Sequence, residues 1–143
     1  MKLISLLLSA LILHLLAIQA FAVTVYDHAQ TGSCISVTRT IDVPAQATIY
    51  ARISTYSAAK KTNTLPDGSS QTIQPEGFAT GSTIVVVPGI NGPVMSINKS
   101  GTGTTSERVL NVNAPHGIVQ VIHIGMCSGG GISVADFTTQ VTW

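Results

Sequence analysis

The chain has 143 residues, and seven Lys and Arg against six Asp and Glu give it a formal net charge of +1. Charged residues are 9% of the sequence and hydrophobic residues 45%, a composition suited to one small domain. A sequence with a net charge this close to zero has no strongly basic surface of the kind that binds nucleic acids, so we expect no nucleic-acid partner.

The first 22 residues have the three-part pattern of a secretory signal peptide. Lys2 precedes an apolar run that closes on Ala20-Phe21-Ala22, with small residues at the two positions that a signal peptidase reads. We expect cleavage after Ala22 and a single mature domain, residues 23–143, that is secreted, periplasmic or on the cell surface. The alternative is an uncleaved membrane anchor, because the run approaches the ~20 residues that span a bilayer. Polar residues within the run favour cleavage, so we expect no membrane span after it.

Beyond residue 22 the sequence pattern is that of β-strands. Thr, Val, Ile and Ser dominate, and turn-forming Gly, Pro, Asn and Asp recur about every 8–12 residues. Residues 57–64 are compatible with a short helical turn. The pattern predicts an all-β fold, an antiparallel β-sandwich (immunoglobulin-like or similar) of about eight or nine short strands. The segments expected as strands are 34–43, 47–53, 71–74, 82–87, 94–98, 108–112, 117–124 and 132–142.

Three of these segments carry more specific expectations. Residues 82–87 form a continuous apolar run, which predicts burial on both faces. Arg39 interrupts the apolar face of segment 34–43 and is interpreted as an edge or strand-end residue. In the last segment Ile132 and Val134 fall on the polar face, which predicts a β-bulge near Ala135.

The chain contains two cysteines, Cys34 and Cys127. Export would place them in an oxidising compartment, where an even number of cysteines is usually paired. We therefore predict one disulfide, between the start of segment 34–43 and a glycine-rich loop after segment 117–124. Closing a loop of this length would stabilise the fold by about 4–5 kcal/mol in the chain-entropy model. The alternative is a free, reactive thiol.

Two patterns suggest chemistry, and both are weak. Residues 125–129, Gly-Met-Cys-Ser-Gly, match the spacing of a nucleophile elbow, but such an elbow requires flanking helices and a later histidine, and none follows Cys127. His116, His123, Met126 and Cys127 include the ligand types of a type 1 copper site. Because Cys127 is assigned to the disulfide, and His123 is expected to be a half-buried, hydrogen-bonded residue, we predict no enzyme, no metal and no other cofactor.

Two surface features bear on binding. Tyr50 and Arg52 share the outer face of one strand and could pack against a sugar ring, which makes them candidate ligand contacts. Asn98-Lys99-Ser100 is an N-glycosylation sequon, which is relevant only if the source is eukaryotic.

The final strand alternates up to an aromatic C-terminus, with Phe137, Val141 and Trp143 on one face. This pattern resembles the last strand of fimbrial subunits assembled by donor-strand exchange, in which residues 23–26 would be the donor extension. The resemblance implies a structural or adhesive subunit of an extracellular assembly with protein partners or self-association. The three side chains would then point into the core or into a partner's groove. The alternative is a secreted binding module for a carbohydrate or protein ligand, an inhibitor or an effector.

Overall fold

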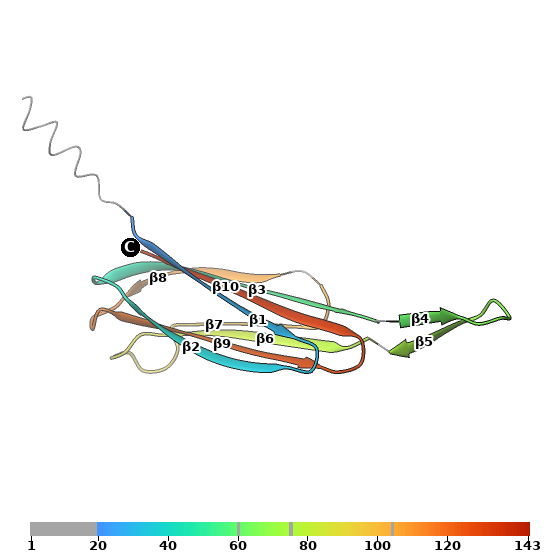
Figure 1. The fold of residues 1–143 in the computed structure, drawn as a ribbon. Coiled ribbons are helices and arrows are strands. Elements are labelled where there is room, and N and C mark those ends of the chain that lie inside the picture. The colour runs from blue at the N-terminus through green and yellow to red at the C-terminus, as the bar shows by residue number, and fades with distance from the viewer. Residues whose placement is uncertain (1–19, 60, 75, 104) are drawn as a thin grey trace, which may run out of the picture.

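The structure is a computed structural model that describes residues 20–59, 61–74, 76–103 and 105–143. Residues 1–19 of the predicted signal peptide therefore lie outside the described residues. Ten strands are present in the described part of the chain, and Figure 1 labels them. Their bounds are β1 (Ala22–Gln30), β2 (Cys34–Asp42), β3 (Gln46–Ala58), β4 (Lys61–Thr64), β5 (Ser70–Gln74), β6 (Phe78–Val86), β7 (Met95–Ser100), β8 (Ser106–Asn113), β9 (Ile118–Ser128) and β10 (Ile132–Thr142).

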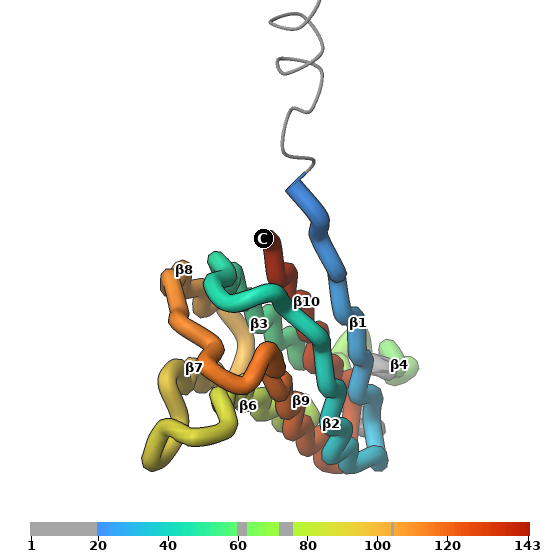
Figure 2. The backbone as a smooth tube through the Cα atoms, turned by 90° about the vertical axis from the view of Figure 1, so that its left-hand side faces the viewer, coloured from blue at the N-terminus to red at the C-terminus, as the bar shows by residue number. Residues whose placement is uncertain are grey.

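Eight of the strands form two four-stranded antiparallel sheets. Sheet A has the order β1-β10-β3-β8, and sheet B has the order β2-β9-β6-β7. The sheets pack face to face as a sandwich (Figure 2), which confirms the predicted all-β antiparallel class. The strands exceed the predicted number because β1 and β4 were not anticipated.

The core fills the space between the sheets and follows the period-2 alternation of the sequence. In β3 the predicted inner residues Ala47, Ile49, Ala51 and Ile53 are all buried. In β10 the inner face consists of alternate residues from Ser133 to Val141. Local alternation therefore predicts which side chains face the core, even where it does not predict which strands are neighbours.

Phe137 of β10 fills a gap in the facing sheet that two glycines create. Gly81 of β6 and Gly125 of β9 are directly paired in register. A Cβ on either would lie 3.0 Å from the Phe137 ring, and one on Gly81 would also lie 2.7 Å from Cγ2 of Ile53. These glycines are required because the aromatic ring occupies the space that their side chains would need.

Three local predictions differ from the structure. The described residues 57–59 and 61–64 contain no helical turn, because β3 continues to Ala58 and β4 begins at Lys61. Strand β6 alternates between buried and partly exposed residues, so its apolar run is not buried on both faces. No bulge interrupts β10, whose register with β1 and β3 is continuous. Ile132 and Val134 instead share the outer face with polar residues.

The predicted disulfide is not formed, and Cys34 and Cys127 are both free thiols. Cys34 pairs in register with Met126, and both side chains lie on the exposed face of sheet B. Cys127 is one residue further along β9, so it points to the opposite face and is 2% exposed. The prediction placed Cys127 in a loop, whereas β9 extends to Ser128. Burial raises the pKa of the Cys127 thiol, which disfavours the reactive thiolate.

Strands β4 and β5 form a separate hairpin that projects from one end of the sandwich, opposite the C-terminus (Figure 1). Within the described residues they pack against each other and against no other strand. In the same part of the chain, no helix is long and apolar enough to cross a membrane.

Candidate functional site

A polar network lies between the sheets, on the side where β1 and β2 face each other. The ring of His123 is fully buried, with Nδ1 2.8 Å from Asp27 Oδ2 and Nε2 2.8 Å from Thr139 Oγ1. Because a carboxylate only accepts hydrogen bonds, Nδ1 donates to Asp27 and Nε2 accepts from the Thr139 hydroxyl. Arg39 extends the network, since its guanidinium lies 3.3 Å from Asp27 Oδ1. The network joins β1 and β10 of sheet A to β2 and β9 of sheet B.

The order hydroxyl, imidazole, carboxylate is that of a Ser-His-Asp catalytic triad. Here the hydroxyl of Thr139 and the ring of His123 are both fully buried, so a substrate cannot reach them. Burial lowers the pKa of His123, and the Asp27 carboxylate only partly opposes this shift. The ring also stacks on Phe137 at 5.1 Å between centroids. This geometry therefore supports a structural role that holds the β1–β2 side of the sandwich together.

Each edge strand of the two sheets carries a charged residue at an inner-face position. These residues are Asp27 in β1, Arg39 in β2, Lys99 in β7 and Arg108 in β8. Pairing with a strand of another molecule would extend the sheet and bury such a charge, so inward charges protect an edge against strand addition. The edges are therefore poorly suited to assembly by strand pairing.

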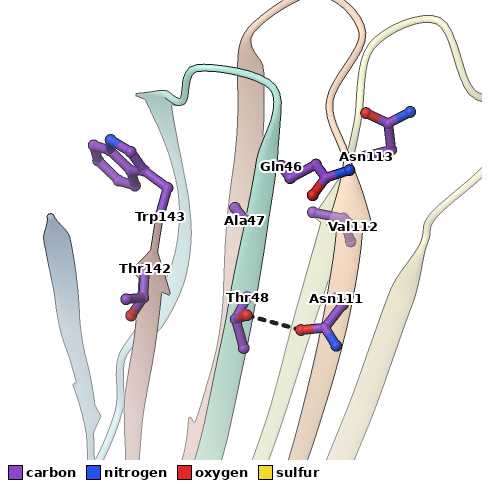
Figure 3. A pocket seen from close by; sticks show the side chains of 8 residues that line it. All are labelled: Gln46, Ala47, Thr48, Asn111, Val112, Asn113, Thr142 and Trp143. Atoms are coloured by element: carbon purple, nitrogen blue, oxygen red, sulfur yellow. Dashed lines mark hydrogen bonds between the residues drawn. The ribbon is translucent and has the colours of Figure 1, made fainter. Parts of the chain in front are cut away.

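A hollow of about 380 Å³ lies at the end of sheet A, where β10 ends, β3 begins and β8 ends (Figure 3). Three segments far apart in the sequence meet there because β3 pairs with both β10 and β8. The hollow contains three primary amides, two hydroxyls and the only tryptophan of the chain, and none of its lining side chains is charged. The lining residues are Gln46, Ala47, Thr48, Asn111, Val112, Asn113, Thr142 and Trp143.

One side-chain hydrogen bond lies within the hollow, and Phe21 contacts Trp143 at its side. Thr48 Oγ1 donates to Asn111 Oδ1 at 2.7 Å, which leaves the amide NH₂ of Asn111 free to donate elsewhere. The backbone of Trp143 makes two hydrogen bonds to Phe21, of 2.8 and 2.9 Å. The two aromatic rings stack with centroids 6.4 Å apart and planes at 23°. Figure 3 shows the indole on one side of the hollow and the amides of Gln46 and Asn113 on the other.

The residues proposed from the final strand fall into two groups. Phe137 and Val141 point into the core of their own chain, whereas Trp143 is half-buried beside the hollow. Strand β10 is not at an edge, because it pairs with β1 on one side and with β3 on the other. It therefore offers no open edge to a partner strand. The proposed donor segment 23–26 lies in β1 of the same molecule.

The ligand-face candidates Tyr50 and Arg52 lie on the outer face of sheet A, the face that carries the hollow. Tyr50 is one row from it, because Thr48 and Tyr50 are consecutive outward residues of β3. The phenol donates a 2.5 Å hydrogen bond to Glu107 Oε2, and this bond raises the pKa of Tyr50. Sequence reasoning therefore placed Tyr50 and Arg52 on an outer face, as the structure does, but did not identify the polar residues at the end of that face.

The metal candidates are not brought together. His123 points into the core, Met126 points out of sheet B, and His116 packs over Gly89 in a turn. Within the described residues, no three His, Cys, Asp or Glu side chains are close enough to hold a metal ion. Residues 125–128, part of the elbow motif, lie within the regular strand β9 rather than in a strand-to-helix turn.

Sequence reasoning missed the buried network, although a signal was present. Asp27, His123 and Thr139 each interrupt an otherwise apolar or small inner face, as Arg39 does. An isolated polar residue at each of several inner positions indicates that these residues pair with one another, because a buried polar group needs a hydrogen-bond partner.

No protein-family model and no curated protein sequence matches the chain. Among solved structures, the chain is similar to the carbohydrate-binding module TmCBM61 in complex with β-1,4-galactotriose, with 9% identity, 88% of each chain covered and a TM-score of 0.48. It is also similar to a Bacillus endospore appendage protein, from a family of disulfide-linked pili, with 10% identity, 86% of this chain and 89% of the other covered, and a TM-score of 0.34. Similarity at this level does not indicate a shared function, so the chain is assigned to the β-sandwich class and to no family.

Proposed function

We propose that the chain is a non-enzymatic, exported binding module that holds an uncharged carbohydrate in the hollow at the end of sheet A. The observation that carries the proposal is the chemistry of the hollow, in which amides and hydroxyls surround a tryptophan without any charged side chain. Localisation outside the cytoplasm follows from the predicted signal peptide.

The polar groups that line the hollow match the hydrogen-bonding groups of a sugar. Each sugar hydroxyl both donates and accepts, as do the primary amides of Gln46, Asn111 and Asn113 and the hydroxyl of Thr142. The apolar face of a sugar ring can pack on the indole of Trp143, which presents an apolar body and one polar N–H group. Signal cleavage after Ala22 would remove Phe21, which stacks on Trp143, and would leave that indole face open.

Binding to an array of neutral oligosaccharides tests the proposal. We expect the mature protein to retain at least one glycan, and Trp143→Ala and Asn113→Ala to weaken its binding by about tenfold or more. Asn113 is exposed, so its substitution should leave the fold intact. Thr38→Ala, on the outer face of sheet B, is the matched control and should bind normally. Absence of glycan binding by the unaltered protein, or normal binding by both hollow variants, would contradict the proposal.

The second candidate function is a structural or adhesive subunit of a fimbria-like assembly. One observation favours it: β1 is the N-terminal strand and pairs with a single neighbour, β10, in its own sheet. A copy of β1 from another molecule could therefore occupy the same position. The inward charges on the edge strands oppose this function, so it ranks below carbohydrate binding.

Adding a synthetic β1 peptide to a chain that lacks residues 1–30 tests the second candidate. A donor-strand subunit should recover its fold with the peptide, and the mature full chain should form oligomers in light scattering. A mature protein that stays monomeric at high concentration would exclude assembly by strand exchange.

A further inference from the structure

The aromatic residues of the outer surface are concentrated on one face. All three tyrosines of the chain, Tyr26, Tyr50 and Tyr56, point outward from sheet A. Tyr26 is 71% exposed and Tyr56 is 52% exposed, whereas Tyr50 is half-buried. The hollow with Trp143 lies at one end of this face. The aromatic surface therefore continues well beyond the hollow.

The strand register arranges the outer face of sheet A in parallel rows. The row of Thr142, Thr48 and Asn111 belongs to the hollow. Successive rows then run across the strands toward Tyr56, each two residues further along. These rows are Thr24, Gln140, Tyr50 and Val109; Tyr26, Thr138, Arg52 and Glu107; His28, Asp136 and Ser54; and Gln30, Val134 and Tyr56.

A second hollow, of about 360 Å³, lies on the same face between β1 and β10. It is lined by residues of the third and fourth rows, among them Tyr26, His28, Asp136 and Thr138. One row, which contains Gln140 and Tyr50, separates it from the hollow at Trp143. From Thr142 to Asp136 the distance is about 20 Å at roughly 3.4 Å per residue, several times the width of a sugar ring.

Polar side chains of the face between the hollows hold one another in place. The hydroxyl of Tyr50 is held by Glu107, one row along, so the phenol ring reaches across the sheet. His28 Nδ1 lies 2.7 Å from Asp136 Oδ1, and Arg52 pairs in register with Glu107. Arg52 and His28 thus each have an acidic neighbour, and a face without an isolated positive charge suits a long ligand without net charge.

We propose that this face binds several consecutive sugars of an extended, neutral polysaccharide chain. Its two hollows would be separate subsites, and the row of Tyr50 would support the sugars between them. This inference rests on the proposed carbohydrate function and deepens it, because it specifies a polymer rather than a mono- or disaccharide as the ligand.

Calorimetric titration with oligosaccharides of increasing length tests the inference. The probes are the cello-, N-acetylated chito-, manno- and β-1,4-galacto-oligosaccharides, each from disaccharide to hexasaccharide. For the series that binds, we expect the hexasaccharide to bind at least about tenfold more tightly than the disaccharide. Tyr26→Ala should remove most of this gain, because Tyr26 lines the second hollow. Tyr50→Phe, which keeps the ring and loses the bond to Glu107, should lower hexasaccharide affinity by a smaller factor.

Phe78→Ala is the matched control, because Phe78 is an exposed aromatic residue on the outer face of sheet B. It should leave the length dependence unchanged. Equal affinity for disaccharide and hexasaccharide, or a normal length dependence in Tyr26→Ala, would overturn the extended site while leaving Trp143-dependent binding intact. Absence of binding in every series would overturn both the extended site and the proposed function.

Discussion

His123 is the residue with the most demanding environment in the molecule. A fully buried imidazole is tolerated because both ring nitrogens have partners, Asp27 and Thr139, and because the neutral form needs no counter-charge. The partners come from strands of the opposite sheet. His123 therefore links the two sheets beside β1, which pairs with only one strand of its own sheet.

This environment predicts that the fold is less stable in acid. Burial lowers the pKa of His123 in the folded chain, so the unfolded chain binds the extra proton first. The stability that neutral His123 contributes is fully present above the histidine pKa of the unfolded chain, about 6.5. It is lost as the pH falls toward the lower pKa that His123 has in the folded chain. Denaturant unfolding between pH 8 and pH 5 should show stability decreasing by at most about 1.4 kcal/mol per pH unit from this residue.

Substitution of single histidines checks the assignment. His123→Gln should lower the stability at neutral pH and flatten its dependence on pH. His116→Gln, in an exposed turn, should leave the dependence as it was. An unchanged pH profile in His123→Gln would show that another group is responsible.

At the scale of elements, β6, β9 and β10 depend on one another through the paired glycines. Gly81 and Gly125 remove two side chains from the inner face of sheet B, and the ring of Phe137 occupies the space. Interiors are packed so closely that one added methyl group has to displace its neighbours. The sheets can therefore approach as they do only with glycine at both positions.

Gly81→Ala should destabilise the protein by about 1–3 kcal/mol, because its Cβ would lie 2.7 Å from Ile53 and 3.0 Å from Phe137. Gly129→Ala is the control, since a Cβ there has no neighbour within 4 Å. Equilibrium denaturation should show a clear decrease in the free energy of unfolding for Gly81→Ala and almost no decrease for Gly129→Ala. Equal stabilities would mean that the sheets adjust without strain.

At the scale of the whole molecule, the described residues of the β4–β5 hairpin do not pack against the strands of the sandwich. An isolated two-stranded hairpin is marginally stable in water. The hairpin projects away from the sandwich (Figure 1), and within the described residues no other strand packs on it. It therefore contributes little to the stability of the sandwich.

Replacing residues 60–75 by a short Gly-Ser linker should change the free energy of unfolding by less than about 1 kcal/mol, because a change in loop length has a small entropic effect. In the intact protein, hydrogen exchange should be much faster in residues 61–74 than in β3 or β9. A loss of several kcal/mol on replacement would show that the hairpin packs against the sandwich in solution.

Several features could be predicted from the sequence because they are local. The alternation in residues 47–53 and 132–142 reports which side chains face the core, and this holds whatever the neighbouring strands are. The strand-forming composition and regular turn signals likewise predicted an antiparallel sandwich. Tyr50 and Arg52 were assigned to an outer face for the same local reason.

What only the tertiary structure decided depends on strand neighbours and register, which join residues far apart in the chain. Cys34 and Cys127 are close in register but point to opposite faces, a result of β9 continuing through Gly125 to Ser128. Strand β10 lies between β1 and β3, although its alternation would suit an edge strand equally well. The hollow at Trp143 combines the ends of three strands, and its polar residues are unremarkable individually. Pairing across the sheets places them together, and a pattern within one strand carries no information about that pairing.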